Sequence, residues 1–212
     1  MAGEGAAAPE EEKKQAPAPT PAAKPAPAKA AAAAGGKKPA APPKKERQGN
    51  KWVVENFTGE TIQFDEEEHD IDKRVVFSIY NCKDTVIIVG GKFQAMNIDS
   101  CKNCEIELQT SISTVSLYKC QRIKVRATKR IPSFSVEGCN QTTLYLHPES
   151  KESHISTSCT RSTMIYTPKE EGKTEAELKA DLDFWKSEPI PEVFTTKFEN
   201  GKFVTEGYLE EE

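Results

Sequence analysis

Residues 75–168 read VVFSIYNCKDTVIIVGGKFQAMNIDSCKNCEIELQTSISTVSLYKCQRIKVRATKRIPSFSVEGCNQTTLYLHPESKESHISTSCTRSTMIYTP, and their pattern decides the fold. Four cysteines stand nineteen residues apart and a fifth follows after twenty: Cys82, Cys101, Cys120, Cys139 and Cys159. Apolar residues keep the same step before each cysteine: Phe77, Met96, Val115 and Phe134, then Ile79, Ile98, Leu117 and Val136. A fixed period near twenty residues is typical of a solenoid.

The apolar rows continue after each cysteine and alternate with polar residues. They comprise Ile87, Ile106, Val125 and Leu144, then Val89, Leu108, Ala127 and Leu146, and finally Phe93, Ile112 and Ile131. With one residue inserted near Ser156, the fifth unit also fits, which places Ile155, Thr163 and Ile165 in the core rows. Alternation of this kind indicates strands. We therefore predict an all-β fold, a right-handed parallel β-helix of about 19 residues per coil.

Residues 1–50 differ in composition from the remainder of the chain. They are nearly all Ala, Pro, Lys, Glu and Gly, and they contain no aromatic residue and no Val, Ile or Leu. Such a segment cannot bury enough apolar surface to offset the entropy of ordering. We predict a disordered tail at 1–50 and a folded β-helix domain at 51–212. The tail carries nine basic and five acidic residues, so it is either a solubilising linker or a weak contact for an acidic partner.

After Pro168 the pattern changes. Thr174 followed by Glu177 matches a capping box and predicts a short amphipathic helix over residues 175–186, with Leu178, Leu182 and Trp185 on one face. Two strands are predicted next, at 194–198 and 202–209, joined by Asn200-Gly201, a strong hairpin signal. A terminal hairpin either caps the solenoid or exchanges with a second copy.

The cysteines and histidines raise the question of chemistry. Cys101-x-x-Cys104 has a zinc-ligand spacing but lacks a second pair, so we interpret the cysteines as small residues in tight corners and expect Cys104, off the ladder, to be exposed. His69-Asp70 ends an acidic loop that we interpret as a solvated turn. We find no catalytic pattern, so we expect no enzymatic activity, no metal and no cofactor.

The outward residues and the overall charge narrow the class of partner. Glu105 and Glu107 should lie beside Lys124 and Arg126, so this basic run is partly matched, and the net charge is −4. We therefore expect no nucleic-acid binding. The chain has no run of eighteen apolar residues and no recognisable signal peptide, so we expect no membrane span and a cytoplasmic location.

Six segments of the chain stand out: residues 51–56 (KWVVEN), 79–82 (IYNC), 91–93 (GKF), 98–102 (IDSCK), 189–194 (PIPEVF) and 200–205 (NGKFVT). They resemble the C-terminal β-helix domain of the adenylyl cyclase-associated proteins. The resemblance implies binding to monomeric ADP-actin, exchange of ADP for ATP on it, and association with the cytoskeleton. It also implies a homodimer formed by C-terminal strand exchange, through residues Asn200, Gly201, Lys202, Phe203, Val204, Thr205 and Tyr208.

The family's helical N-terminal domain and its Leu-Lys-Lys actin motif have no counterpart here, so we expect a short form without the functions of that half. We expect one broad sheet face to contact actin through Lys92, Asn97, Asp99, Lys102, Tyr80 and Lys83. The main alternative is the related β-helix of tubulin folding cofactor C, which acts on a GTPase through an arginine finger, for which Arg122 in Cys120-Gln121-Arg122 is the candidate. A non-catalytic cytoskeletal scaffold is the third possibility.

Overall fold

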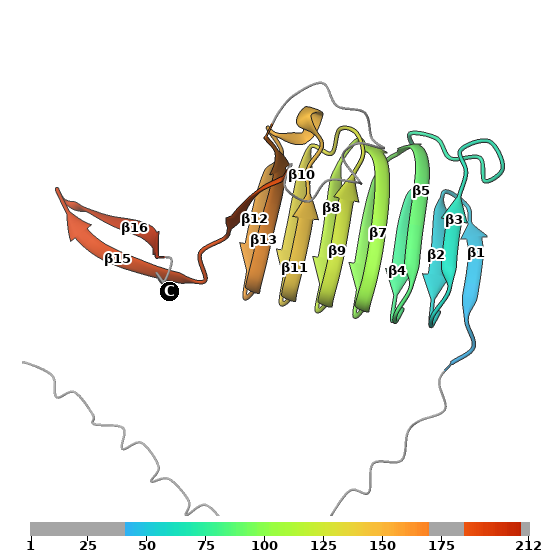
Figure 1. The fold of residues 1–212 in the computed structure, drawn as a ribbon, viewed down its shortest axis with the longest axis horizontal. Helices are drawn as coiled ribbons and strands as arrows, with labels where there is room; N and C mark the ends of the chain where they lie inside the picture. The colour runs from blue at the N-terminus through green and yellow to red at the C-terminus, as the bar shows by residue number, and fades with distance from the viewer. Residues whose placement is uncertain (1–40, 170–184, 209–212) are drawn as a thin grey trace, which may run out of the picture. The chain divides into compact units, whose positions relative to one another are not determined.

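Two seven-stranded sheets face each other in the computed structural model, which describes residues 41–169 and 185–208 (Figure 1). The first sheet has the strand order β1 (Lys44–Gln48), β2 (Lys51–Glu55), β4 (Val76–Tyr80), β6 (Ala95–Asp99), β8 (Thr114–Tyr118), β10 (Ser133–Glu137) and β12 (His154–Ser158). The second has the order β3 (Thr61–Phe64), β5 (Val86–Phe93), β7 (Lys102–Ser111), β9 (Gln121–Ala127), β11 (Asn140–Tyr145), β13 (Arg161–Pro168) and β14 (Trp185–Pro189).

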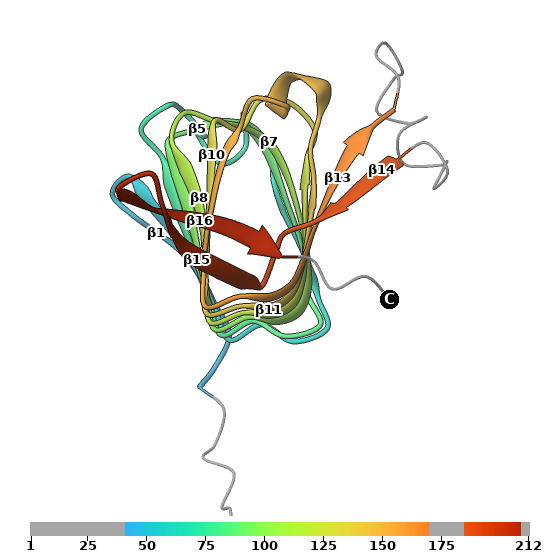
Figure 2. The ribbon, with the colours of Figure 1, turned by 90° about the vertical axis from the view of Figure 1, so that its left-hand side faces the viewer.

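Successive coils stack in register, so the predicted parallel β-helix is confirmed. Phe77 pairs with Met96, Met96 with Val115, and Val115 with Phe134, as the nineteen-residue step requires. In the end-on view of Figure 2 the coils superimpose and enclose a narrow core between the sheets. The inward rows are almost fully buried, and each large side chain contributes about 1.5–3 kcal/mol. The single residue predicted to be inserted near Ser156 is wrong: Ser133 already pairs with His154 and Phe134 with Ile155, so the step is 21 residues and the added residues precede His154. Ile155, Thr163 and Ile165 nevertheless continue the predicted core rows.

One predicted core position is wrong. Ile112 is 39% exposed, and Ser111 occupies the interior instead, in register with Phe93. A register shift between Val89 and Lys92 moves the coil by one residue at this bend. The Ser111 hydroxyl satisfies its burial by donating to the Ser113 carbonyl (2.9 Å). The period therefore fails at a bend, where the number of residues per coil changes.

The folded domain begins earlier than predicted. Residues 44–48 form β1, which pairs antiparallel with β2, so the boundary at Asn50 is too late. Lys45 reaches the Phe64 ring, with its Nζ 4.4 Å from the ring centroid, and Arg47 donates to the His69 carbonyl (3.2 Å). These polar residues find partners at the open end of the solenoid, a role that composition does not reveal. Residues 1–40, and the prediction that they are disordered, lie outside the described residues.

The N-terminal end of the core is covered by rings. Trp52, Phe64 and His69 pack edge to face, with centroids 5.2–5.5 Å apart. Phe77 continues the series, 5.0 Å from Phe64 and 5.4 Å from Phe93. The turn predicted over the acidic residues 65–70 is present, and it carries His69 back over the core. The first coil therefore closes the end of the solenoid by aromatic packing.

The C-terminal part corrects the predicted helix. Most of residues 175–186 lie outside the described residues, but Trp185 and Lys186 begin β14, which pairs antiparallel with β13. Trp185 is buried against Tyr145, with centroids 5.2 Å apart. The described residues contain no α-helix and only a short 3-10 helix, η1 (Pro148–Ser150). No helix among them is long and apolar enough to cross a membrane.

The predicted hairpin is present, as β15 (Val193–Glu199) and β16 (Lys202–Tyr208). Asn200 and Gly201 both have positive φ, 51° and 80°, which is the geometry of a two-residue type I′ turn. Phe198 pairs with Phe203 across the strands. The sequence signal and the structure agree here because the turn chemistry is entirely local.

Candidate functional site

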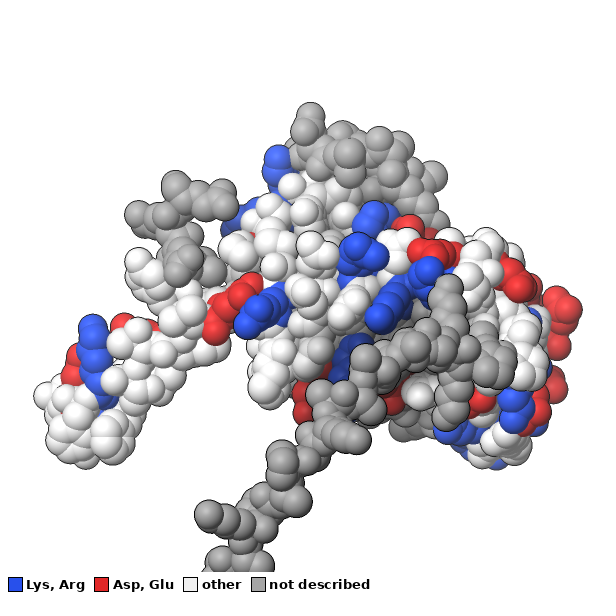
Figure 3. Space-filling view, turned by 90° about the horizontal axis from the view of Figure 1, so that it is seen from below, with Lys and Arg blue, Asp and Glu red and all other residues white. Residues whose placement is uncertain are grey.

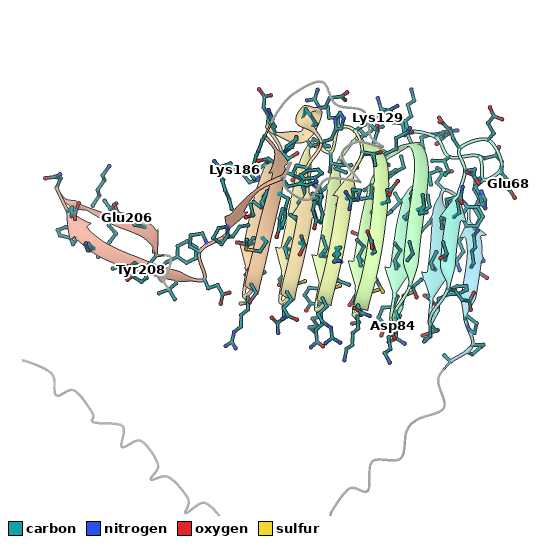
Figure 4. All side chains as sticks on the ribbon, viewed as in Figure 1. Glu68, Asp84, Lys129, Lys186, Glu206 and Tyr208 are labelled. Carbon is teal, nitrogen blue, oxygen red and sulfur yellow. The ribbon has the colours of Figure 1, made fainter. Side chains whose placement is uncertain are left out.

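The coils turn at what we call the lower edge, where first-sheet strands end and second-sheet strands begin. Figure 4 labels Asp84 on this edge and Lys129 on the opposite, upper edge. In four successive turns two residues with positive φ flank a cysteine, as Asn81 and Asp84 do around Cys82. The cysteine points inward, and its Sγ donates to the carbonyl of the second residue before it, Tyr80 in this coil (3.5 Å). Cys101, Cys120 and Cys139 repeat this contact at 3.3–3.4 Å.

The buried thiols are therefore corner residues. Cys104, which we expected to be exposed, is only 2% exposed, and it donates to the Lys102 carbonyl (3.3 Å). Cys159 is instead exposed, because it occupies the positive-φ position of its turn. Contacts with Cys104 and the other neighbouring thiols, together with burial, raise the pKa of Cys101. The Cys101 thiol is therefore held protonated, which makes it a poor nucleophile and a poor metal ligand, whereas hydrogen bonding to Cys101 lowers the pKa of Cys82, Cys104 and Cys120.

A row of carboxylates and tyrosines runs along the outer face of the first sheet beside the lower edge. We call it the acidic–tyrosine row; each member is the last residue of its strand, and consecutive members pair in register: Glu55, Tyr80, Asp99, Tyr118 and Glu137. Tyr80 and Tyr118 are 45% and 37% exposed, which is unusual for large rings on a sheet. From Tyr80 to Glu137 the row follows the nineteen-residue period, and Glu55 joins it from the longer first coil. Acids and rings therefore alternate at the strand spacing of about 4.8 Å.

The polar groups around the row are ordered. Ser100 Oγ donates to Asp99 Oδ1 (2.7 Å), and Asn81 Nδ2 donates to Asn56 Oδ1 (2.7 Å). Lys119 Nζ lies over the Tyr118 ring, 4.6 Å from its centroid. Hydrogen bonding to Tyr118 raises the pKa of Lys119, and Asp99 and Glu137 add to the effect. The row is therefore a surface on which an ammonium group finds both a ring and carboxylates.

Five of the six residues predicted to contact a partner lie together near the lower edge. Tyr80, Asn97 and Asp99 are on β4 and β6, and Lys83 and Lys102 form a parallel bridge at the next turn. Lys92 does not join them. It lies near the end of β5 in the second sheet, around the bend that follows Val89. The segment 91–93, which resembles the family, suggested that Lys92 lies close to the other five residues, but the coil carries Lys92 onto the second sheet.

Basic side chains concentrate on the lower edge. The exposed cations Lys83, Lys102, Lys119 and Arg122 lie at three successive turns there, with Lys119 and Arg122 in the same turn. Figure 3, seen from below, shows Lys and Arg gathered over the middle coils and acidic residues toward the N-terminal coils. Asp84 holds its place through Asn103 Nδ2 (2.5 Å), and this hydrogen bond lowers the pKa of Asp84.

Arg122, the arginine-finger candidate, lies at a positive-φ position of the third turn. It lines a shallow hollow of about 240 Å³ with Asp84, Asn103 and Lys124. The hollow contains carboxylates as well as cations: Glu105, which also lines it, is in register with Lys124. The predicted neighbours Glu105–Lys124 and Glu107–Arg126 are both confirmed in the sheet register.

The acidic loop brings Asp65, Glu68 and His69 close enough to share an ion. Both ring nitrogens of His69 already have protein partners. Nδ1 accepts from the Asp65 backbone N–H (3.2 Å), and Nε2 lies 3.1 Å from Lys45 Nζ. The ring packing of His69 thus accounts for its position without a metal.

The hairpin exposes an unusual amount of apolar surface. Phe194, Phe198, Phe203 and Tyr208 are 58–74% exposed, and every residue of β15 is exposed. A two-stranded hairpin is marginal in water unless it packs against something. β12, at the end of the first sheet, has a neighbour on one side only among the described strands, whereas the second sheet ends in the antiparallel strand β14. Within the part of the chain that the structure describes, an apolar hairpin is exposed and one edge of β12 is unpaired.

Reasoning from the sequence missed two features of this site. Glu55 extends the row of Tyr80, Asp99, Tyr118 and Glu137, but the nineteen-residue period does not reach it, because the first coil is longer. The free edge of β12 had no sequence signal, because it depends on which later strands pair with it.

Comparison with known proteins identifies a family and several relatives that this domain resembles. A family model described as "Adenylate cyclase associated (CAP) C terminal" matches residues 41–209, which include β1 and the hairpin. The chain is 28% identical over 162 residues to an adenylyl cyclase-associated protein of Dictyostelium discoideum, covering 75% of this chain and 32% of that protein. It is 30% identical over 165 residues to cyclase-associated protein 1 of Arabidopsis thaliana, covering 77% and 32%. The chain thus spans about a third of the length of these curated relatives.

A solved structure supports the fold. The crystal structure of the cyclase-associated protein from Cryptosporidium parvum superimposes with a TM-score of 0.67 at 24% sequence identity. The match covers 79% of this chain and 96% of that one. The likeness therefore extends over nearly the whole of the solved chain.

Proposed function

This chain belongs to the adenylate cyclase-associated (CAP) C-terminal family, and from that membership we propose that its β-helix binds monomeric actin in the cytoplasm. The family match over the entire β-helix and hairpin is the observation that carries the proposal. In this proposal the chain acts by binding rather than by catalysis. It promotes replacement of ADP by ATP on actin and so returns monomers to the cytoskeleton.

The contact face in this proposal is the part of the first sheet around the acidic–tyrosine row. It offers the exposed rings Tyr80 and Tyr118, and mixed charges from Asp99 and the lysines of the lower edge. Tyrosine is enriched at energetically important interface positions because it buries a large rigid ring and keeps a polar end. Lys92 is left out of this face, since it lies on the other sheet.

Nucleotide exchange requires no chemical step from the chain. A protein that binds the nucleotide-open form of actin more tightly than the closed form shifts the population toward release. The size of the acceleration is limited by that difference in affinity. A rigid sheet face is suited to this role, because its side chains are held in place before binding.

The test is release of a fluorescent ADP analogue from monomeric actin, with and without the full chain. An Asn97→Ala/Asp99→Ala variant should lose most of the acceleration, and Lys92→Ala should retain it. Arg122→Ala serves as the contrast for the arginine-finger alternative. If Arg122→Ala abolishes stimulation of GTP hydrolysis by tubulin, and the chain leaves ADP release unchanged, the actin proposal fails.

We further propose that the chain is a homodimer formed by exchange of C-terminal strands. The hairpin of one copy would cover its exposed rings by packing on a second copy, and the free edge of β12 offers a strand for pairing. Exchange of a terminal element needs little new interface, because the contacts that the element would make within one copy form between two copies instead. Sedimentation of the full chain tests this directly: a monomer at tens of micromolar would refute it.

A further inference from the structure

We propose that Glu192 takes the place of a further coil at the end of the second sheet, and so sets the direction in which the hairpin leaves the β-helix. Glu192 belongs to the segment 189–194 (PIPEVF), which leads from the last coil into the hairpin. The consequence for assembly rests on the homodimer proposed above, but the contact itself lies within one chain.

The corners of the inner coils show which acceptor the last corner needs. At the second positive-φ position of a turn, the backbone N–H donates to a carbonyl of the next coil. The pairs are Gly59 with Lys83 and Asp84 with Lys102, both at 3.0 Å. Ser162 occupies this position in the last coil, with φ 52°, and no further coil follows among the described strands. Its N–H donates to Glu192 Oε1 instead, so a side chain supplies the acceptor that the main chain supplies elsewhere.

The segment reaches this corner by following β13. Pro189 is in register with Met164, and the Ile190 N–H donates to the Thr163 carbonyl (2.9 Å). The prolines on both sides of Ile190 keep the segment extended, because proline fixes its own φ and restricts the residue before it. The chain therefore descends along β13 one residue at a time until the Glu192 side chain meets the corner.

The base of the hairpin depends on this segment for its orientation. The Pro191 ring lies against the main chain of β16, since a Cβ added at Gly207 would be 2.7 Å from the Pro191 Cγ. The segment and the hairpin therefore form one unit. Val193 and Tyr208, which pair at the base of the hairpin, border a hollow of about 320 Å³ beside β13. Because that space is open, close packing of side chains does not hold the base there.

The bond between Ser162 and Glu192 acts on direction more than on stability. Both residues are exposed, so water can replace either partner, and the bond adds little to the free energy of unfolding. What water cannot replace is the link between the corner of the last coil and the base of the hairpin. Without that link, we expect the hairpin to pivot about the segment.

The direction matters because the two sheets end differently. Within the described residues, β14 and the segment close the second sheet, whereas β12 leaves one edge of the first sheet open. The rings of the hairpin are exposed, so the hairpin does not fold back onto its own first sheet. A hairpin that is held outward is prepared for β12 of a second copy, and loss of the hold adds an ordering cost to association.

Time-resolved fluorescence anisotropy tests the hold on the hairpin in a single chain. A dye is attached at Lys197→Cys in the full chain with Cys159→Ser, which removes the exposed thiol, and is measured at nanomolar concentration. We expect Glu192→Ala to increase the amplitude of the fast decay by roughly twofold, because the hairpin then moves independently. Glu192→Gln keeps an oxygen acceptor and should match the parent, as should the control Glu188→Ala, an exposed carboxylate of β14.

Equal decays in the parent and in Glu192→Ala would overturn the proposal. Cross-strand NOEs between Thr196 and Thr205 show whether the hairpin itself stays paired. We expect these NOEs to persist in Glu192→Ala. A faster decay that appears only together with their loss would reflect unfolding of the hairpin, and it would also overturn the proposal.

Sedimentation equilibrium of the same variants without dye tests the consequence for assembly. Glu192→Ala should raise the dissociation constant of the dimer by about tenfold, and Glu192→Gln should leave it unchanged. A dimer of unchanged affinity in Glu192→Ala would overturn this consequence. If the parent chain stays monomeric at tens of micromolar, the homodimer proposal fails, and the anisotropy comparison alone decides the role of Glu192.

Discussion

Phe77 and Phe134 occupy the same inward row of the β-helix, three coils apart, and allow one comparison to test the packing. Both are at most 1% exposed. Phe134 stacks between Val115 and Ile155, and no aromatic ring contacts it among the described residues. Phe77 lies edge to face with Phe64 on one side and Phe93 on the other.

Truncation of either ring removes buried surface and leaves a cavity. Phe134→Ala should lower the free energy of unfolding by about 3–5 kcal/mol. Phe77→Ala also removes two aromatic pairs, each worth about 0.5–1.5 kcal/mol beyond burial. We therefore expect Phe77→Ala to cost about 1–3 kcal/mol more than Phe134→Ala. Tyr118→Ala, on the outer face, should cost much less than either.

The assay is equilibrium unfolding in urea, followed by far-ultraviolet circular dichroism, with the slope compared between variants. An unchanged slope shows that each variant unfolds through the same exposure of surface. A cost below about 1 kcal/mol for Phe134→Ala would refute the assignment of this row to the core. Equal costs for the two phenylalanines would refute the contribution of the aromatic pairs.

Three other predictions follow from the ends and corners of the domain. Removing residues 1–40 should leave the melting temperature unchanged. Removing residues 1–49 also deletes β1 and should lower the melting temperature, by about 2–4 °C for each kcal/mol of stability lost. Equal melting temperatures for the two deletions would contradict the role of β1. In the native protein only Cys159 should react rapidly with a thiol reagent, and the buried cysteines should react at the rate of unfolding; rapid reaction of Cys104 would show that its corner is open. Deleting residues 190–212 should convert a dimer to a monomer in sedimentation, and an unchanged mass would place the dimer contact elsewhere.

The fold could be predicted because the sequence repeats. The nineteen-residue step fixed which residues pair, as Phe77 with Met96 shows, and a pairing rule repeated in every coil leaves few alternatives. The step fails at Ser111 and Ile112, where a bend takes one residue fewer. Composition alone also failed at Lys44–Gln48, because a polar edge strand depends on the partner it covers.

The candidate site was predicted less completely. Tyr80, Asp99, Tyr118 and Glu137 recur at the same outward position every nineteen residues in the sequence, and the structure adds Glu55 to their row. Lys92 was misplaced because nearness in sequence does not indicate which sheet a side chain joins. Trp185 has the spacing of an amphipathic helix but lies in β14, where Tyr145 and Tyr166 bury it. Tertiary packing overrides a local helical pattern in such a case.

The uniform coil has a kinetic consequence. Each contact between neighbouring coils closes a loop of nearly the same length, so no coil has an entropic advantage in forming first. Side chains must decide the order, and the ring series Phe64–Phe77–Phe93 favours the N-terminal coils. Once two coils have formed, each further strand can pair with the exposed strand edge of the coil before it. In pulsed hydrogen exchange during refolding, the amides of β4 should therefore become protected before those of β10. The addition of coils ends at β12, the last strand of the first sheet.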